Sequence, residues 1–360
     1  MKLPDSPLRA LVVCPGRGSY TNAERGYLRR PLAKERRAQL DRAISAVNAQ
    51  RAAADLPALE AIDGADRLRT MHHAGENISS LILACTALDF LSIDESRVEL
   101  VAAVGNSMGW YSALFCAGAL TLEDTFTLVQ TMGAMGRDAA EGLIGGQLLY
   151  PTVDDNWRRD PAKVAAVESA LQTAVAGGLR AGHSIRFGGF AVVWGEEEAL
   201  AIAESALPAL QVGSRTYPLR LRGHAAFHSS LLQPYSTRGL TLLGDLGWRQ
   251  PTLPLIDGRG HQWQTLSTDP TALGDYTLRT QVLETYDFTA SIRVAMREYA
   301  PDLLLCLGPG DSLGAAVAHV LIADGWQGIT DRAAFSSRQA ESPLLISFAR
   351  AEQRTLVASN

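Results

Sequence analysis

The stretch Val98-Glu-Leu-Val-Ala-Ala-Val-Gly-Asn-Ser-Met-Gly-Trp-Tyr-Ser-Ala-Leu114 joins two apolar runs through a turn that contains two glycines. Residues 98–104 predict a buried strand, and residues from about 108 to 117 predict a helix. The turn between them is Gly105-Asn106-Ser107-Met108-Gly109, and it is so sharp that side chains at the glycine positions would clash with the strand and the helix. A buried strand, a glycine turn and a helix in this order are typical of an α/β domain.

Strands and helices also alternate on both sides of this segment. Before it, residues 8–14 predict a buried strand that runs into the tight loop 15–19. After the middle of the chain, residues 302–307 predict another strand. Helices are expected over about 32–54, 77–90, 122–140, 276–299 and 313–323. This alternation predicts a mostly parallel sheet covered by helices on both faces.

The pattern changes between residues 144 and 222. Strands are expected at 147–153, 183–187, 190–194 and 216–221, with helices at 161–176 and 197–210. The order strand-helix-strand-strand-helix-strand is the ferredoxin-like arrangement. We therefore expect an α/β fold with a large α/β-hydrolase-like domain, residues 1–143 and 223–345, and an inserted ferredoxin-like domain, residues 144–222. Residues 346–360 are predicted to form a C-terminal tail.

The composition is that of an ordinary soluble protein. The chain has 360 residues, of which 47% are hydrophobic and 20% charged, enough to bury a sizeable core. The formal charge of -5 argues against a nucleic-acid binder. Residues 25–51 are locally basic, which we interpret as a solvated helix face, with a small anion-binding patch as the alternative.

The cysteines and the N-terminus exclude several classes of protein. Cys14, Cys85, Cys116 and Cys306 are far apart and form no C-x-x-C pair, so neither a zinc site nor a disulfide framework is expected. The apolar run 11–14 is too short for a signal peptide or a membrane span. We expect a cytoplasmic monomer without a metal or a membrane partner.

Ser107 is the first candidate nucleophile, because it occupies the serine position of a G-x-S-x-G motif between a strand and a helix. Gly310-Asp311-Ser312-Leu313-Gly314 is a second match in a similar position. A serine hydroxyl needs a base within hydrogen-bond reach. His183, His224, His228 and His261 all follow Ser107, whereas only His319 follows Ser312 and should lie two helical turns away from it. We therefore favour Ser107 and interpret Ser312 as a turn residue.

Several motifs resemble, in order and spacing, those of the malonyl-CoA:acyl carrier protein transacylase family. Residues 104–120, VGNSMGWYSALFCAGAL, are similar to the family's active-site segment G-H-S-L-G-E-Y-[ST]-A-L. Residues 15–19, PGRGS, resemble its P-G-Q-G-[SA] loop, and residues 226–232, AFHSSLL, resemble its F-H-S-x-x-[ML] segment. Gln281 matches a glutamine of the family, and residues 307–310, LGPG, match its [IL]-G-P-G turn. The resemblance covers about residues 11–320.

The resemblance implies an acyltransferase that moves an acyl group from coenzyme A to an acyl carrier protein through an acyl-enzyme on Ser107. It implies that His228 is the general base and acid. The oxyanion hole would be formed by the backbone N–H groups of Arg17 and Met108, and a carbonyl near Gln281 would orient His228. Acyl-CoA is then a substrate, the carrier partner brings a phosphopantetheine arm, and no bound cofactor is expected.

The sequence departs from the family around the acyl pocket, which we place at Asn106, Trp110, Met132 and Asn77. The family's carboxylate-binding arginine is replaced by Met132, and a thioether cannot substitute for a guanidinium that holds a malonyl carboxylate. Arg137 lies about 140° around the predicted helix from Met132, so it is expected to be a poor substitute. We predict a neutral acyl group, acetyl or longer. Malonyl transfer with Arg17 as the carboxylate partner is the alternative.

Other interpretations of these residues stay open. Met132 could be plain helix core, and Trp110 an ordinary packing aromatic. The same serine and histidine would serve an acyl hydrolase that strips acyl groups from carrier proteins. A non-catalytic module that only binds a carrier protein or a polyketide synthase partner is a further alternative.

Overall fold

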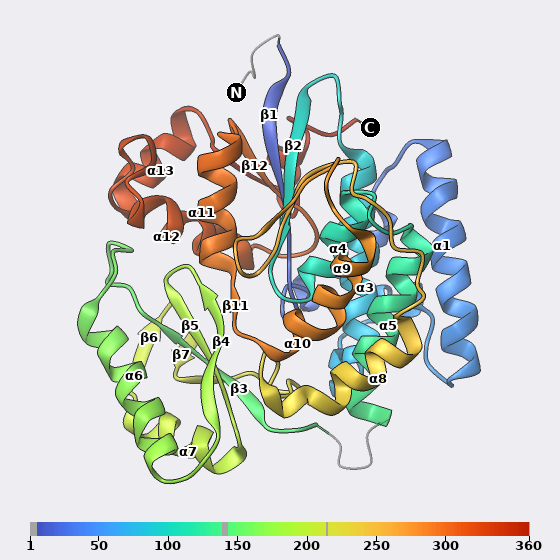
Figure 1. Ribbon diagram of the computed structural model, residues 1–360. Helices are drawn as coiled ribbons and strands as arrows, with labels where there is room; N and C mark the ends of the chain where they lie inside the picture. Colours follow the sequence, from blue (N-terminus) through green and yellow to red (C-terminus); the bar gives the residue numbers. More distant parts are fainter. Residues whose placement is uncertain (1–5, 139–142, 214, 360) are drawn as a thin grey trace.

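A six-stranded sheet runs through the larger part of the molecule in the computed structural model, which describes residues 6–138, 143–213 and 215–359 (Figure 1). All its neighbouring strands pair in parallel except the edge strand β10. The strands, in their order across the sheet, are β10 (Gln262–Trp263), β9 (Leu255–Ile256), β2 (Val98–Gly105), β1 (Leu8–Cys14), β12 (Leu303–Cys306) and β13 (Leu345–Ser347). β1 and β2 are buried in the middle, so their apolar runs are explained by cover on both faces.

Helices flank the central strands on two sides. Figure 1 shows α11 (Phe288–Tyr299), α12 (Ser312–Ala323) and α13 (Arg332–Glu341) on one side of β1 and β2. On the other side lie α1 (Lys34–Ala53), α3 (Gly75–Ser92), α4 (Gly109–Cys116) and α5 (Leu122–Asp138). Shorter helices complete the unit: α2 (Leu59–Asp63), α8 (Gln233–Leu243), α9 (Pro270–Asp275) and α14 (Ala351–Arg354).

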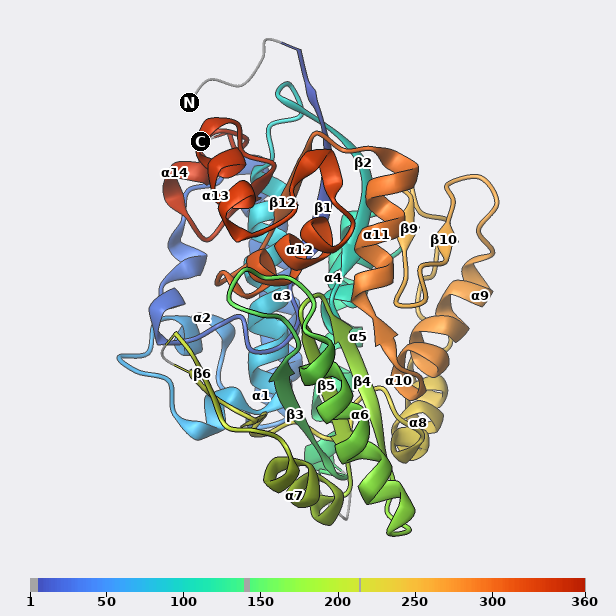
Figure 2. The same ribbon diagram turned by 90° about the vertical axis from the view of Figure 1, so that its left-hand side faces the viewer.

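A second, smaller unit lies at one end of the large one (Figures 1 and 2). Its strands are β3 (Gly146–Pro151), β4 (Ala181–Phe187), β5 (Phe190–Gly195) and β8 (Leu219–Arg220), and its helices are α6 (Pro161–Ala176) and α7 (Glu197–Ala206). The order β4-β5-β3-β8 is that of a ferredoxin-like sheet. A hairpin, β6 (Leu210–Val212) and β7 (Arg215–Tyr217), precedes β8. The predicted fold class is thus confirmed.

The predicted single helix over residues 276–299 is wrong. The chain forms a π-helical turn (Tyr276–Thr280), the short helix α10 (Gln281–Leu283) and the strand β11 (Tyr286–Asp287) before α11 begins. The break has two physical causes: β11 pairs in parallel with β4 of the small unit, and the Asp287 side chain caps α11 by accepting from Ala290 N–H. A periodic apolar pattern cannot reveal a break that depends on pairing with a distant strand.

The C-terminal segment beyond Leu345, predicted as a tail, contributes to the large unit. Its residues Ile346 and Ser347 belong to β13, which pairs with β12, and Ile346 and Phe348 are fully buried. Among the residues with described positions, no helix combines the length and apolar character needed to cross a bilayer.

The turn between β2 and α4 is built on two backbone contacts that exclude side chains. A Cβ atom on Gly105 would lie 2.1 Å from the carbonyl of Gly109, and one on Gly109 would lie 2.3 Å from the Cys14 carbonyl oxygen at the end of β1. The second G-x-S-x-G match differs, because a Cβ on Gly314 would meet no atom within 4 Å. Gly310 of the second match is tightly packed, with a Cβ position 2.2 Å from the Ser19 carbonyl oxygen, so only the first match has close backbone packing at both of its glycines.

This difference predicts opposite effects of the same substitution. Gly109→Ala should lower the free energy of unfolding by about 3 kcal/mol or more, because the Cys14 carbonyl must move to accept the methyl group. Gly314→Ala is the matched control, and in helix α12 it should be neutral or stabilise by about 0.5–1 kcal/mol. Urea unfolding of both variants measures the two effects, and equal stability of the two would contradict the packing described.

Candidate active site

Ser107 stands at the tip of the turn between β2 and α4, with its hydroxyl held by a histidine. Its Oγ lies 2.7 Å from Nε2 of His228. Both residues have left-handed backbone conformations, with φ of 56° for Ser107 and 59° for His228. Such conformations are unfavourable for residues other than glycine and are concentrated at functional sites. The pair is therefore fixed by the surrounding fold.

His228 is oriented by the main chain of Gln281. The imidazole Nδ1 lies 2.6 Å from the Gln281 carbonyl oxygen and must donate to it, since a carbonyl can only accept. That carbonyl is available because α10 ends at Leu283, which removes its helical hydrogen-bond partner. The helix break after α10, which the sequence did not predict, thus makes the Gln281 carbonyl available as an acceptor. The Gln281 side chain adds a second link, donating from Nε2 to the Ser107 carbonyl at 3.2 Å.

Nδ1–H donation leaves the Nε2 lone pair facing the serine, which is the tautomer a general base requires. Burial lowers the pKa of His228 to about 4, and the hydrogen bond to Gln281 opposes this shift only in part. The imidazole is therefore neutral over the usual working range of pH.

Two backbone N–H groups in the segments around Ser107 have no partner among the described residues. Arg17 follows β1 in the loop 15–19, and Met108 begins the turn into α4. Within residues 6–138, 143–213 and 215–359, the N–H groups of Arg17 and Met108 donate to no protein acceptor. These are the residues that the motifs predict for an oxyanion hole.

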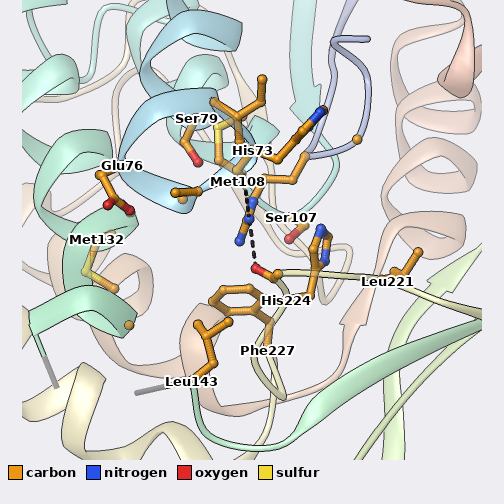
Figure 3. A pocket seen from close by; sticks show the side chains of 18 of the residues that line it. His73, Glu76, Ser79, Ser107, Met108, Met132, Leu143, Leu221, His224 and Phe227 are labelled. Carbon is orange, nitrogen blue, oxygen red and sulfur yellow. Dashed lines mark hydrogen bonds between the residues drawn. The ribbon is translucent and has the colours of Figure 1, made fainter. Parts of the chain in front are cut away.

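A cavity of about 1240 Å³ opens at Ser107 (Figure 3). Of the predicted site residues, it is lined by Ser107, His228, Arg17, Met108, Met132 and Gln281. Its walls are mainly apolar and include Ile78, Val129, Leu143, Phe227, Leu232 and Val282. The cavity is large enough for a ligand of substantial size.

Three predicted acyl-pocket residues lie outside this lining. Trp110 is fully buried in the core, where its Nε1–H donates to Thr277 Oγ1 at 3.0 Å and its ring packs edge-on against Tyr276. Asn106 is buried beneath the turn, against Gly16. The described lining residues of the cavity include neither Trp110 nor Asn106, and they do not include Asn77. The prediction that Trp110 makes the pocket more apolar is therefore wrong, and its interpretation as a packing aromatic fits.

Asn77 is held away from the cavity by a buried arginine. Arg51 of α1 donates to Asn77 Oδ1 and to the Glu76 carbonyl, each at 2.6 Å, and to Gln130 Oε1 at 2.9 Å. The Asn77 amide in turn donates to the Met71 carbonyl at 2.8 Å. Both functional groups of the Asn77 side chain are thus occupied.

Arg137 lines the cavity together with Met132, contrary to the expectation from their helical angle. Arg137 follows Gly133 by about one helical turn, and Gly133 also lines the cavity. The angle from Met132 alone therefore did not predict that Arg137 faces the cavity. Its Nη1 lies 3.9 Å from Oε1 of Glu76, a carboxylate whose side chain is only 9% exposed. A long side chain paired with a cavity carboxylate could not be foreseen from spacing on one helix.

The side chain of Arg17 also enters the cavity. Its Nη2 donates to the carbonyls of Gly223 at 3.0 Å and His73 at 3.4 Å, while its buried Nε has no partner within the described parts of the chain. Burial lowers the pKa of Arg17 to about 10, and the charge of Glu76 offsets part of that shift. Arg17 therefore stays charged.

The other candidate serine and histidines lie elsewhere. Ser312 begins α12 at the surface, and His319 of that helix accepts a hydrogen bond from Gly189 N–H at 3.1 Å. His183 pairs with Glu168 at 2.8 Å, and His261 packs against Trp263. Of the histidines that follow Ser107, only His224 joins His228 among the described lining residues of the cavity, and nothing but its place four residues earlier marked it in the sequence. In the part of the chain that is described, no cluster of His, Cys, Asp and Glu could hold a metal ion.

Known proteins were compared with the chain in sequence and in structure. No family model matches it. The malonyl CoA-acyl carrier protein transacylases of Salmonella typhimurium and Escherichia coli K12 are each 24% identical over 217 residues, 60% of this chain. The aligned region spans 65% of the length of these relatives.

Solved structures show the same fold over nearly the whole chain. A malonyl-CoA:acyl carrier protein transacylase from Xanthomonas oryzae superposes with a TM-score of 0.71 at 18% identity, covering 98% of this chain and all of that one. The enzyme from Clostridium perfringens gives 0.69 at 20% identity, with 96% and 94% covered. A malonyl-transacylase in complex with a type II polyketide synthase acyl-carrier protein gives 0.68 at 18% identity, with 97% and 99% covered. The resemblance drawn from the motifs is confirmed: in sequence and in fold, this chain is related to the malonyl-CoA:acyl carrier protein transacylases.

Proposed function

We propose that this protein is an acyltransferase that moves an acyl group from coenzyme A to an acyl carrier protein through an acyl-enzyme on Ser107. The observation that carries the proposal is the 2.7 Å contact between Ser107 Oγ and Nε2 of an imidazole whose Nδ1–H is fixed on the Gln281 carbonyl. A serine needs such a base to attack a thioester. The relatives named above, which include a carrier protein complex, support the direction of transfer.

In the proposed reaction, His228 takes the Ser107 proton as Oγ bonds to the thioester carbonyl carbon. The N–H groups of Arg17 and Met108 stabilise the oxyanion, and the imidazolium then protonates the departing thiolate. The carrier thiol attacks the acyl-enzyme in the reverse sense, with His228 again as base. A neutral carbonyl behind the imidazole suffices to hold it, so no acidic third residue is needed.

We propose further that the acyl group is neutral, acetyl or longer. Met132, which the motifs match to the family's carboxylate-binding arginine, lines the cavity, and most of the wall is apolar. The cavity carboxylate Glu76 already pairs with Arg137, and its charge favours the protonated form of Arg17. A malonyl carboxylate would have to compete with Glu76 for these cations and would be repelled by it. The unpartnered Nε of Arg17, the presence of Arg137 in the cavity lining and the malonyl transacylases among the relatives favour the malonyl alternative.

Acylation of Ser107 tests the reaction directly. The protein is incubated separately with malonyl-, acetyl- and hexanoyl-CoA, and the masses of the intact protein and of the Ser107 peptide are read. We expect an adduct with a neutral acyl group that is lost in Ser107→Ala, kept in the control Ser312→Ala and passed to added carrier protein. Release of free acid without transfer would indicate the hydrolase, and absence of any adduct would indicate a binding module.

Two substitutions separate the acyl-group alternatives. Met132→Arg should raise the malonyl-to-acetyl ratio of kcat/KM at least about tenfold, because a guanidinium supplies the missing counter-charge. Arg17→Gln, which restores the family's residue, should leave that ratio within about twofold. The ratio is used because it cancels any general loss of rate. A tenfold fall of the ratio in Arg17→Gln would instead identify Arg17 as the carboxylate partner.

The pH dependence of acylation tests the state of His228. The folded-state pKa of about 4 lies below the ordinary value of 6.5, so the base stays unprotonated as pH falls through 6.5. The kcat/KM for acylation should be flat from pH 8 to about 5.5 and should decline with a midpoint near 4. Rapid mixing into acidic buffer, followed by acid quench and mass measurement, gives the profile. A midpoint near 6.5 would show that burial does not lower the pKa of His228.

A further inference from the structure

His224 is a second imidazole in the cavity, and the proposed reaction does not use it. It is partly buried in the loop between β8 and His228. Its Nδ1 lies 2.8 Å from Oε1 of Gln147, a residue of β3. The position of this ring is thus set by the small unit, whereas Ser107 belongs to the large one.

A chain of hydrogen bonds fixes which ring nitrogen carries the proton. The Ser184 hydroxyl donates to the Phe227 carbonyl at 2.8 Å, so its oxygen accepts from the amide nitrogen of Gln147 at 2.5 Å. The Gln147 side chain must then present its carbonyl oxygen to His224, which donates from Nδ1. The lone pair is left on Nε2.

Nε2 of His224 is an open acceptor. No group in the described residues forms a hydrogen bond with this atom. It is also not one of the fully buried polar atoms that lack a partner, so it is accessible, and His224 lines the cavity. Burial and the neighbouring charge of Arg17 hold the pKa of His224 well below its usual value. The ring is therefore neutral and can accept.

The position of His224 indicates which part of a substrate would meet it. Figure 3 shows Met132 and Glu76 on one side of Ser107, and Leu221 with His224 on the other. An acyl group directed towards Met132 leaves the opposite side for the arm that carries the sulfur. The carbonyls of Gly223 and His73 nearby accept from Arg17, whereas Nε2 of His224 has no partner among the described residues.

We propose that His224 is a positioning residue that accepts a hydrogen bond from an amide N–H of the pantetheine arm through its Nε2 atom. This role rests on the proposed function, because it requires that the substrate be a pantetheine thioester. Pantetheine carries two amide groups, and each buried amide N–H needs an acceptor. A hydrogen bond of this kind holds the thioester carbonyl against Ser107 and the two backbone donors, so that the bound substrate is already oriented for attack by Ser107.

Two substitutions separate the proposed contact from a structural role. His224→Asn keeps a donor near the Nδ1 position for Gln147 and removes the acceptor at Nε2. His224→Gln is the matched control, because its amide can place an oxygen near the Nε2 position. Thermal unfolding of both variants checks that the fold is intact.

Acetyl and hexanoyl groups are each supplied on coenzyme A, on N-acetylcysteamine, which retains one amide, and on ethanethiol, which has none. In His224→Asn we expect kcat/KM for Ser107 acylation by the CoA thioester to fall about three- to tenfold, mainly through KM. Reaction with the ethyl thioester should change less than about twofold, and His224→Gln should recover most of the loss. N-Acetylcysteamine shows whether the amide nearest the sulfur makes the contact.

Equal losses with the CoA and ethyl thioesters would overturn the proposal, since a merely structural residue would affect both. Unchanged reaction of His224→Asn with the CoA thioester would also overturn it. Failure of all three donors to acylate the unaltered protein is a different result, because it would refute the proposed function itself and this role with it.

Discussion

The contact between the turn after β2 and the end of β1 is the constraint on which the site depends. Gly109 sits against the Cys14 carbonyl with no room for a Cβ atom, and Gly105 sits equally close to Gly109. This approach brings the loop that follows β1 alongside the turn, so that Arg17 lines the same cavity as Ser107 and Met108. Two glycines thus join the ends of two strands far apart in sequence at one corner of the cavity.

The units of the fold meet at the same place. His228 comes from the segment that returns from the small unit, and Gln281 comes from a helix that ends because β11 pairs with β4 of that unit. The orientation of the base is therefore coupled to the docking of the inserted sheet. A neutral carbonyl is adequate here because burial already keeps the imidazole unprotonated, and a buried carboxylate at that point would stabilise its charged form instead.

The sequence predicted what depends on local pattern. Strand β1, the serine turn, α6 and the order of the ferredoxin-like unit follow from apolar periodicity and glycines. Matched motifs singled out Ser107, His228, Arg17 and Gln281. Prediction from the sequence failed for features that depend on contacts between distant segments. The helix break before α11, the core position of Trp110 and the approach of Arg137 to Glu76 are of this kind. The sequence did not distinguish His224 from the other histidines. Its proposed role depends on hydrogen bonds that link it to Gln147 and, through Gln147, to Ser184.

The left-handed backbone at Ser107 and His228 has a consequence for the evolution of this protein. Such conformations cost about 1–3 kcal/mol each in residues other than glycine. Glycine would relieve that cost at both positions, yet it would remove the two side chains that face each other. Selection for thermal robustness alone would thus erode the site. The hydrogen bond between Ser107 and His228 is therefore held at a local cost in stability.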